Sequence, residues 1–251
     1  MSMKTLLGSA LVLSQLLPDA VFAQVAPEFT RFSITASPTF LQPASDFGQN
    51  INAAFGGGGG FLYRLDRSGV LSFRFDLSGE RYGIERRQVP FSETVGQRVL
   101  VKLSTANWIA SFNVGPELAR PRGFFRPYGN AGFSRLLLRT TSSVNSENAS
   151  ENPIATTTNY SDGTNALFFG GGLRFPLAAE RSHGIVELDL GLRYVRGGYA
   201  SYLREGSIQD IPGGPIFIAP INSKTSHMIY TAGVHIRIPH DPARACPRFV
   251  C

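Results

Sequence analysis

The chain has 251 residues, of which 27 are glycine and 19 are phenylalanine, and only 17% are charged. A soluble domain usually carries roughly 25% charged residues, so this composition argues against an ordinary water-soluble protein and favours one with part of its surface in lipid. The net charge of +6 comes without a cluster of Lys, Arg and stacking aromatic residues, which argues against nucleic-acid binding.

Residues 1–23 have the features of a secretory signal peptide. A charged start at Lys4 precedes an apolar run over 6–17, and small residues around Ala23 suit a cleavage site. No later stretch has the roughly 18 consecutive apolar residues that would hold the chain in an inner membrane as a helix. We therefore expect an exported protein whose main domain covers 24–239, followed by a short periplasmic tail over 240–251.

Eight later segments alternate apolar with polar side chains. In chain order they cover about 30–40, 51–65, 70–79, 104–115, 125–134, 165–175, 184–198 and 226–238. Because successive side chains of a strand point to opposite faces, each segment is predicted to be a strand between an apolar and a polar environment. Each segment is long enough for the roughly 9–11 residues that a membrane strand needs.

The connections between these segments alternate in length. Those after the second, fourth and sixth segments are short, whereas those after the first, third, fifth and seventh are longer and polar or rich in proline. An even strand count with short turns on one side and long loops on the other is typical of bacterial outer-membrane barrels. The prediction is an all-β, eight-stranded, antiparallel up-and-down transmembrane β-barrel with both ends on the periplasmic side.

The polar faces predict a charged lumen. An eight-stranded barrel has an interior that its own side chains about fill, and inward glycines make room there for larger neighbours. The residues expected in this network are Arg31, Arg64, Arg74, Asp76, Arg174, Glu187, Asp189, Arg193, His235 and Arg237. Arginines outnumber acids in this set, so a net basic interior is expected, with some arginines bonded to backbone carbonyls, tyrosines, water or loop acids. These charges either fill the lumen or serve conduction or gating.

The chain resembles the small outer-membrane barrels of the OmpA and OmpX type. The resemblance covers about 28–239 and is carried by the segments RPYGNAGFS, FFGGGLRF and VELDLGLRYV. The segment TAGVHIRI looks like the last-strand signal that the outer-membrane assembly machinery reads, which implies this machinery as a partner. The residues of that signal are Thr231, Gly233, Ile236 and Ile238.

The end of the chain differs from the family pattern. Members usually end on an aromatic residue, whereas this chain continues beyond Ile238 with PHDPARACPRFVC. The tail holds Cys246 and Cys251, which could close a small disulfide in an oxidising periplasm or remain a free pair. No peptidoglycan-binding domain follows, so the cell-wall anchoring of larger relatives is not expected.

Two connections have distinctive compositions. Residues 140–165 are polar and low in charge, and are expected to form a mobile external loop. Residues 211–221, IPGGPIFIAPI, form an apolar patch between prolines. This patch is expected to fold back on the barrel mouth, or else to contact lipid or another protein.

These observations favour a non-enzymatic bacterial outer-membrane barrel that stabilises the envelope or presents its loops to an unknown ligand. The alternatives are a narrow channel or porin, a lipid A-modifying enzyme, and a soluble periplasmic lipocalin-like barrel. No catalytic residue is proposed, because Ser182–His183 and Ser226–His227 are adjacent pairs and neighbouring strand residues face opposite ways. No metal site and no cofactor are expected, while the expected partners are outer-membrane lipid and lipopolysaccharide.

Overall fold

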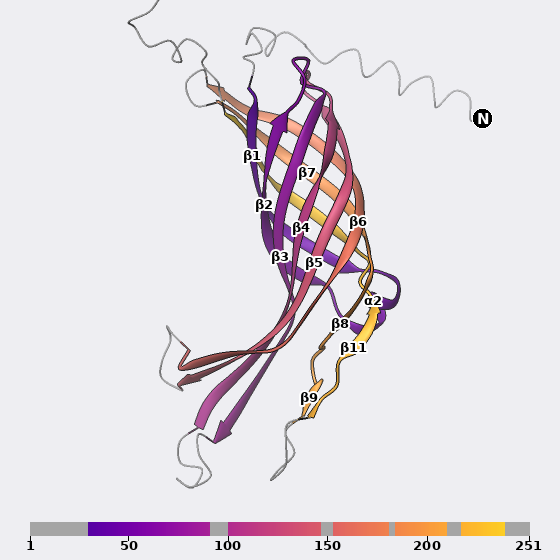
Figure 1. Ribbon diagram of the computed structural model, residues 1–251. Helices are drawn as coiled ribbons and strands as arrows, with labels where there is room; N and C mark the ends of the chain where they lie inside the picture. The colour runs from indigo at the N-terminus through magenta and orange to yellow at the C-terminus, as the bar shows by residue number, and fades with distance from the viewer. Residues whose placement is uncertain (1–29, 91–99, 147–152, 181–183, 210–216, 239–251) are drawn as a thin grey trace, which may run out of the picture.

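Eight strands of the chain close into an antiparallel barrel in the computed structural model, which describes residues 30–90, 100–146, 153–180, 184–209 and 217–238 (Figure 1). The barrel strands are β1 (Phe32–Pro43), β2 (Ala54–Arg64), β3 (Leu71–Pro90), β4 (Leu100–Ala119), β5 (Arg126–Ser146), β6 (Ala155–Glu180), β7 (Gly184–Gly197) and β12 (His227–Ile238). Each pairs with the next, and β1 pairs with β12 from Phe32↔Ile238 to Pro43↔His227. The predicted up-and-down barrel is confirmed.

The two ends of the barrel differ. Residues 65–70, 120–125 and 181–183 connect strands at one end, where Phe32 and Ile238 also lie, and we call it the turn end. At the opposite end, the loop end, the strands are joined by the longer connections 44–53, 91–99, 147–154 and 198–226, of which the first holds a short helix and the last holds further short strands. The predicted alternation of short turns and long loops is confirmed.

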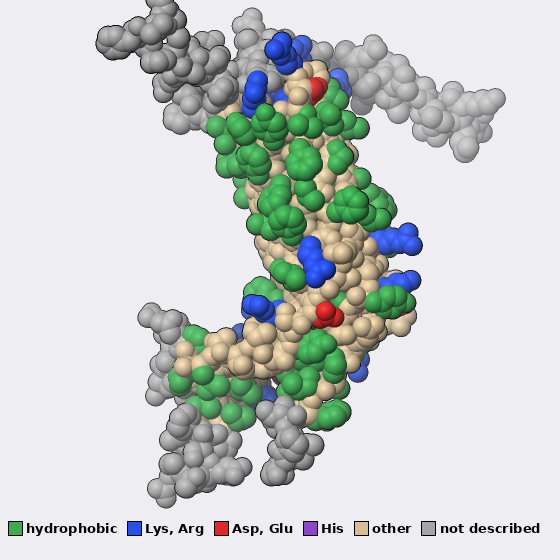
Figure 2. Space-filling view, viewed as in Figure 1, with side chains coloured by type: hydrophobic (Ala, Val, Ile, Leu, Met, Phe, Trp, Pro, Cys, Tyr) green, Lys and Arg blue, Asp and Glu red, His purple; other side chains and the backbone are tan. Residues whose placement is uncertain are grey.

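The outer wall of the barrel is apolar. In Figure 2, hydrophobic side chains cover the wall from the turn end onwards, and Lys or Arg side chains appear beyond them towards the loop end. Outward residues that are largely exposed are Ile34, Phe55, Phe61, Phe73, Leu77, Phe112, Phe133, Leu167, Phe169, Leu190, Leu192 and Val234. The inward residues between them are mostly polar or glycine, as the alternation predicted.

Strands β3 to β6 continue past the barrel as a projecting four-stranded sheet (Figure 1). The β4–β5 pairing extends to Val101↔Ser146, and the β5–β6 pairing to Val144↔Ala155. The expected external loop over 140–165 is therefore wrong in part, because 140–146 and 155–165 are strand; 147–152 lie outside the described residues. The extension is rich in Thr, a good strand former, but lacks the apolar face by which the other strands were recognised.

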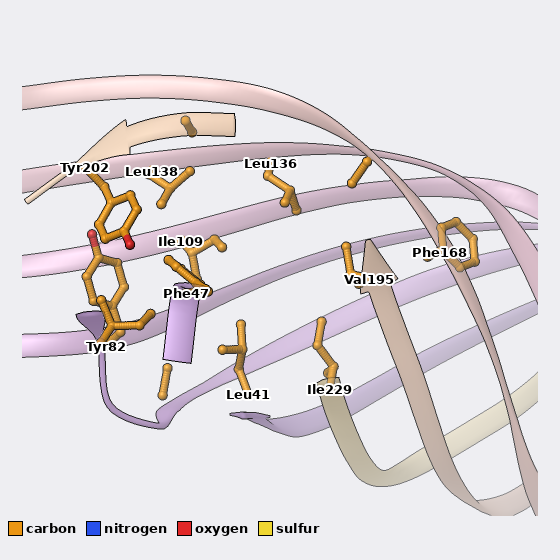
Figure 3. Packing of buried hydrophobic residues seen from close by; sticks show 14 residues of the cluster. Leu41, Phe47, Tyr82, Ile109, Leu136, Leu138, Phe168, Val195, Tyr202 and Ile229 are labelled. Atoms are coloured by element: carbon orange, nitrogen blue, oxygen red, sulfur yellow. The ribbon is translucent and has the colours of Figure 1, made fainter. Parts of the chain in front are cut away.

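An apolar plug closes the loop end of the barrel (Figure 3). The short helix α2 (Ser45–Asn50) places Phe47 at the centre of this plug, with its ring perpendicular to that of Tyr202 at a centroid distance of 5.1 Å. Inward residues of the barrel strands, including Leu41, Ile109 and Leu136, pack beneath it. The sequence predicted neither the helix nor an apolar part of the lumen.

A hairpin of β8 (Tyr199–Tyr202) and β11 (Ile221–Lys224) packs beside this plug, followed outward by β9 (Ile208–Gln209) paired with β10 (Phe217–Ile218). Of the apolar patch 211–221, residues 211–216 lie outside the described residues. Phe217 and Ile218 are exposed, whereas Ile221 packs against the plug. The expectation that this loop folds back on the mouth therefore applies to Ile221 and not to β10.

Three sequence predictions fall on residues that the structure does not describe: the signal peptide over 1–23, the tail over 240–251, and the Cys246–Cys251 pair. Within the described ranges, no helix is long and apolar enough to cross a membrane.

Candidate functional site

The lumen between the plug and the turn end holds a buried network of ion pairs. At its centre Glu117 of β4 accepts hydrogen bonds from Nη1 and Nη2 of Arg174, at 2.7 and 2.9 Å, and from Nη1 of Arg74 at 2.8 Å. The Glu117 side chain is only 1% exposed. A carboxylate with two guanidinium partners is well compensated for its loss of water.

Asp76 of β3 extends the network towards the plug. It accepts hydrogen bonds from Nε of Arg74 at 2.8 and 2.9 Å, and from Nη2 of Arg193 at 2.6 Å. The Arg193 guanidinium lies 4.7 Å from the ring centroid of Phe168, which belongs to the plug. Arg193 therefore joins the charged part of the lumen to the apolar part.

Tyr128 of β5 reaches over β6, inside the barrel, to Asp189 of β7. Its hydroxyl donates to Oδ1 of Asp189 at 2.7 Å, while Nε of Arg174 donates to Oδ2 at 3.1 Å. The Arg174 guanidinium also lies over the Tyr128 ring, 4.1 Å from its centroid. Gly172 and Gly191 give the phenol its space, since a Cβ at either would stand 2.6 or 2.8 Å from the Tyr128 hydroxyl.

Glu187 of β7 organises a second cluster near the turn end. It accepts hydrogen bonds from Nε of Arg237 at 2.9 Å and from Nδ1 of His235 at 2.9 Å, and it pairs with Arg126. The Glu187 side chain is 1% exposed, so these three partners replace the water it has lost.

The structure brings most of the predicted lumen residues together. Arg74, Asp76, Arg174, Glu187, Asp189, Arg193, His235 and Arg237 all take part in the contacts described above. Arg64 is half-buried and lines a small space at the turn end without joining an ion pair to the network among described residues. Arg31 precedes β1 at the turn end and is exposed there, so its predicted place in the lumen stays a prediction.

Glu117 is the important residue that the sequence analysis missed. The predicted fourth segment ends at Gly115, two residues before Glu117. The β4–β5 pairing does skip Gly115 and Pro116, but it resumes at Glu117↔Asn130. Had the alternation of Ser111 and Asn113 been continued, it would have placed Glu117 inward. Its carboxylate reduces the expected excess of arginine, and the network arginines bond mainly to carboxylates.

Little space remains among these side chains. Two voids of about 50 and 30 Å³ lie in the charged part of the lumen. The first lies beside Asp76, Tyr128 and Arg193, and the second beside Arg126 and Arg237. Each has room for one or two water molecules, and the ion pairs around Glu117 lie between them.

Glu80 of β3 marks the boundary between the charged network and the plug. Its side chain is fully buried, and neither carboxylate oxygen has a hydrogen-bond partner among the described residues. It neighbours Ile109 of the plug and faces Gly56 of β2.

No arrangement of catalytic or metal-binding groups accompanies the network in the described part of the chain. No group of three His, Cys, Asp or Glu residues suitable for a metal ion occurs there. His227 is buried beneath Phe47, with its Nδ1 2.8 Å from the Thr225 carbonyl oxygen. The residues of the predicted assembly signal lie on β12, with Thr231 and Gly233 inward and Ile236 and Ile238 outward; Ser182–His183 lies outside the described residues.

No family model and no curated protein sequence matches the chain. Solved structures similar to it include Neisserial surface protein A, with 14% identity, a TM-score of 0.38, and coverage of 83% of this chain and 98% of that one. Ail, the attachment invasion locus protein of Yersinia pestis, has 15% identity, a TM-score of 0.39, and coverage of 82% and 96%. A major outer membrane protein from Thermus thermophilus has 11% identity, a TM-score of 0.46, and coverage of 82% and 98%. Identities this low carry no information about function.

Proposed function

We propose that this chain is a non-enzymatic protein of the bacterial outer membrane, with a closed lumen and a projecting sheet that it presents outside the cell. The observation that carries this proposal is the reversed polarity of the barrel. Phe55, Phe133 and Phe169 are 68%, 69% and 59% exposed on the wall, while Glu117 and Glu187 are 1% exposed inside. Soluble domains rarely expose so continuous an apolar surface, because it remains costly until lipid or a partner covers it.

The backbone pairing of the barrel also favours a location in the membrane. In lipid every N–H and C=O group must be satisfied within the protein, and a closed sheet achieves this because it has no edges. The β1–β12 pairing removes the last edge of this barrel. A soluble lipocalin-like barrel would instead keep its apolar faces inside, so it fits these residues poorly.

The dense packing of side chains in the lumen favours a structural role over ion conduction. The plug around Phe47 fills the loop end, and the ion pairs around Glu117 and Glu187 fill the rest. An eight-stranded barrel leaves little interior beyond what its side chains occupy. What remains for interaction is the sheet of β3 to β6 beyond the barrel, together with the hairpins formed by β8 to β11.

Fractionation tests this proposal directly. The protein is expected in the outer-membrane fraction, and to migrate faster on SDS gels before boiling than after, because a closed barrel resists unfolding by detergent. Recovery in the soluble periplasmic fraction, with the same mobility in both gel samples, would overturn it. A soluble periplasmic protein of the same host serves as the fractionation control.

A further inference from the structure

A hollow of about 710 Å³ lies on the outer wall of the barrel, across β4, β5, β6 and the end of β7. Its apolar part is formed by outward side chains of the wall. Its polar part holds two arginines, Arg135 and Arg196, and one amide, Asn165. The lining residues that carry the argument are Phe112, Phe133, Leu167, Arg135, Asn165 and Arg196.

The hollow exists because β7 ends beside it. Gly197 and Gly198 close this strand, and the chain then leaves the wall for β8. The Gly198 N–H donates to the Asn165 carbonyl oxygen at 3.1 Å, so the backbone stays paired here while Gly197 and Gly198 contribute no side chain to the hollow. The strands of the wall therefore stay hydrogen-bonded to one another here, while the outer surface of the wall is indented.

The two arginines line this indentation from either side of β6, Arg135 from β5 and Arg196 from β7. Arg135 pairs with Asn165 across β5 and β6, and Leu167 pairs with Arg196 across β6 and β7. Nη1 of Arg135 donates to Oδ1 of Asn165 at 2.9 Å, which holds the guanidinium in place and leaves its other donors free for a ligand. Both arginines are exposed, and the ion pairs formed between described residues include neither.

Their position suits a lipid phosphate. Arg135 follows Phe133 by one outward position on β5, and Arg196 follows Tyr194 by one on β7, in each case towards the loop end. They lie in the zone where Figure 2 shows Lys and Arg side chains, with the exposed Leu137 as the next outward residue after Arg135 on β5. Guanidinium groups bind phosphate oxygens with good geometry, and basic side chains at the membrane interface attract anionic headgroups.

We propose that this hollow binds one phosphorylated lipid of the outer leaflet. The phosphate lies between Arg135 and Arg196, and an acyl chain runs along Phe112, Phe133 and Leu167 towards the middle of the wall. A free phosphate would leave the apolar part empty, and a zwitterionic lipid would present its own cation to the two arginines. This inference rests on the proposed function, because it requires the wall to lie in lipid.

Native mass spectrometry of the detergent-solubilised protein, titrated with bisphosphorylated lipid A, tests the inference. One lipid A is expected per barrel, and lipid A without its phosphates is expected to bind at least about tenfold more weakly, a difference of ~1.4 kcal/mol. The double variant Arg135→Gln/Arg196→Gln is expected to lose binding by at least the same factor. Excess inorganic phosphate is expected not to displace the lipid.

The matched control is Arg81→Gln/Arg139→Gln, which removes the same charge from the same outer face but outside the hollow. It is expected to bind lipid A within about twofold of the unaltered protein. Equal binding of both lipids by the unaltered protein, or equal losses in the two double variants, would overturn the lipid site. Heat-dependent gel mobility after insertion into phosphatidylcholine vesicles separates the two proposals. A protein that inserts but lacks this selectivity contradicts only the lipid site, whereas one that fails to insert contradicts both.

Discussion

The hydroxyl of Tyr128 donates a hydrogen bond of 2.7 Å to Asp189 inside the barrel, although the two residues belong to strands that do not pair with each other. β6 lies between them, and its inward residue at this level is Gly172, which pairs with both Tyr128 and Gly191. The contact therefore ties β5 to β7 over the top of β6. It is possible only because glycine occupies the intervening position.

Gly172→Ala tests this arrangement. The added Cβ would stand 2.1 Å from the Leu190 carbonyl oxygen and 2.6 Å from the Tyr128 hydroxyl, so backbone or ring must move. We expect a loss of about 1–3 kcal/mol in the free energy of unfolding, measured by urea denaturation in detergent micelles. Gly79→Ala on β3 is the control, because its Cβ would meet no atom within 4 Å. Equal stability of the two variants would contradict the proposed role of Gly172.

Glu117→Gln tests the centre of the ion-pair network. The variant removes the charge that compensates Arg74 and Arg174, so we expect a loss of about 3–5 kcal/mol in the free energy of unfolding. Glu85→Gln breaks the more exposed ion pair between Glu85 and Arg87 on the projecting sheet, and is expected to cost less than about 1 kcal/mol. Similar losses in both would mean that Glu117 does not stabilise its arginine partners.

Leu190→Arg tests which face of the wall meets lipid. An arginine at the bilayer midplane costs roughly 2–4 kcal/mol in a barrel, so insertion of the Leu190→Arg variant into vesicles is expected to fall sharply. The control is Thr157→Arg on the projecting part of β6, which is expected to insert normally. Single cysteines at Leu188 and Leu190 should react with lipid-soluble probes, and those at Glu187 and Asp189 should not. The reverse labelling pattern would exclude the membrane orientation.

Phe47→Ala tests whether the plug alone keeps the lumen closed. The variant is expected to be less stable by about 3–5 kcal/mol, because it leaves a cavity at the centre of the plug. We nevertheless expect no stable conductance in planar bilayers from either the variant or the unaltered protein. The ion pairs between β3, β4 and β6 still fill the lumen beneath the plug. Steady open channels in the variant would show that the plug is the sole barrier.

The turn between β2 and β3 is expected to depend on pH. Asp66 accepts hydrogen bonds from the Ser68 hydroxyl and from the Leu71 and Val70 N–H groups, which lower its pKa to about 2. Because the folded pKa lies below the unfolded value, this contribution to stability is present above about pH 4 and is lost as pH falls towards 2. The difference in unfolding midpoint between the unaltered protein and Asp66→Asn should shrink over that interval. A difference that stays constant would contradict it.

The barrel strands could be predicted from the sequence because each has an apolar outer face. An alternation such as Leu188–Asp189–Leu190 indicates a strand between an apolar and a polar environment. The prediction failed where this apolar outer face ends. Thr156 and Thr157 extend β6 with polar side chains on both faces, a composition that predicts a loop over 140–165. The prediction also missed the plug, because Phe47 lies on a helix of only six residues that is held by tertiary packing and has no amphipathic repeat.

The charge network was predicted as a set of residues but not as a set of pairs. Inward direction follows from the period of a strand, whereas partners depend on register and on the stagger between strands. Arg174 of β6 reaches Glu117 of β4 across β5, and nothing in the local sequence indicates that contact. Arg31 was placed inward by the same alternation but precedes β1.

The pairing of β1 with β12 makes the first and last strands of the barrel neighbours. This contact spans almost the whole described sequence, so its loop-closure entropy is the largest of any strand pair in the ring. A nascent chain that has not yet reached His227 offers two unpaired edges, on β1 and β7, which lipid cannot satisfy. For the proposed membrane barrel we therefore expect insertion and ring closure to be coupled late events, with the open edges protected until then from pairing with other chains.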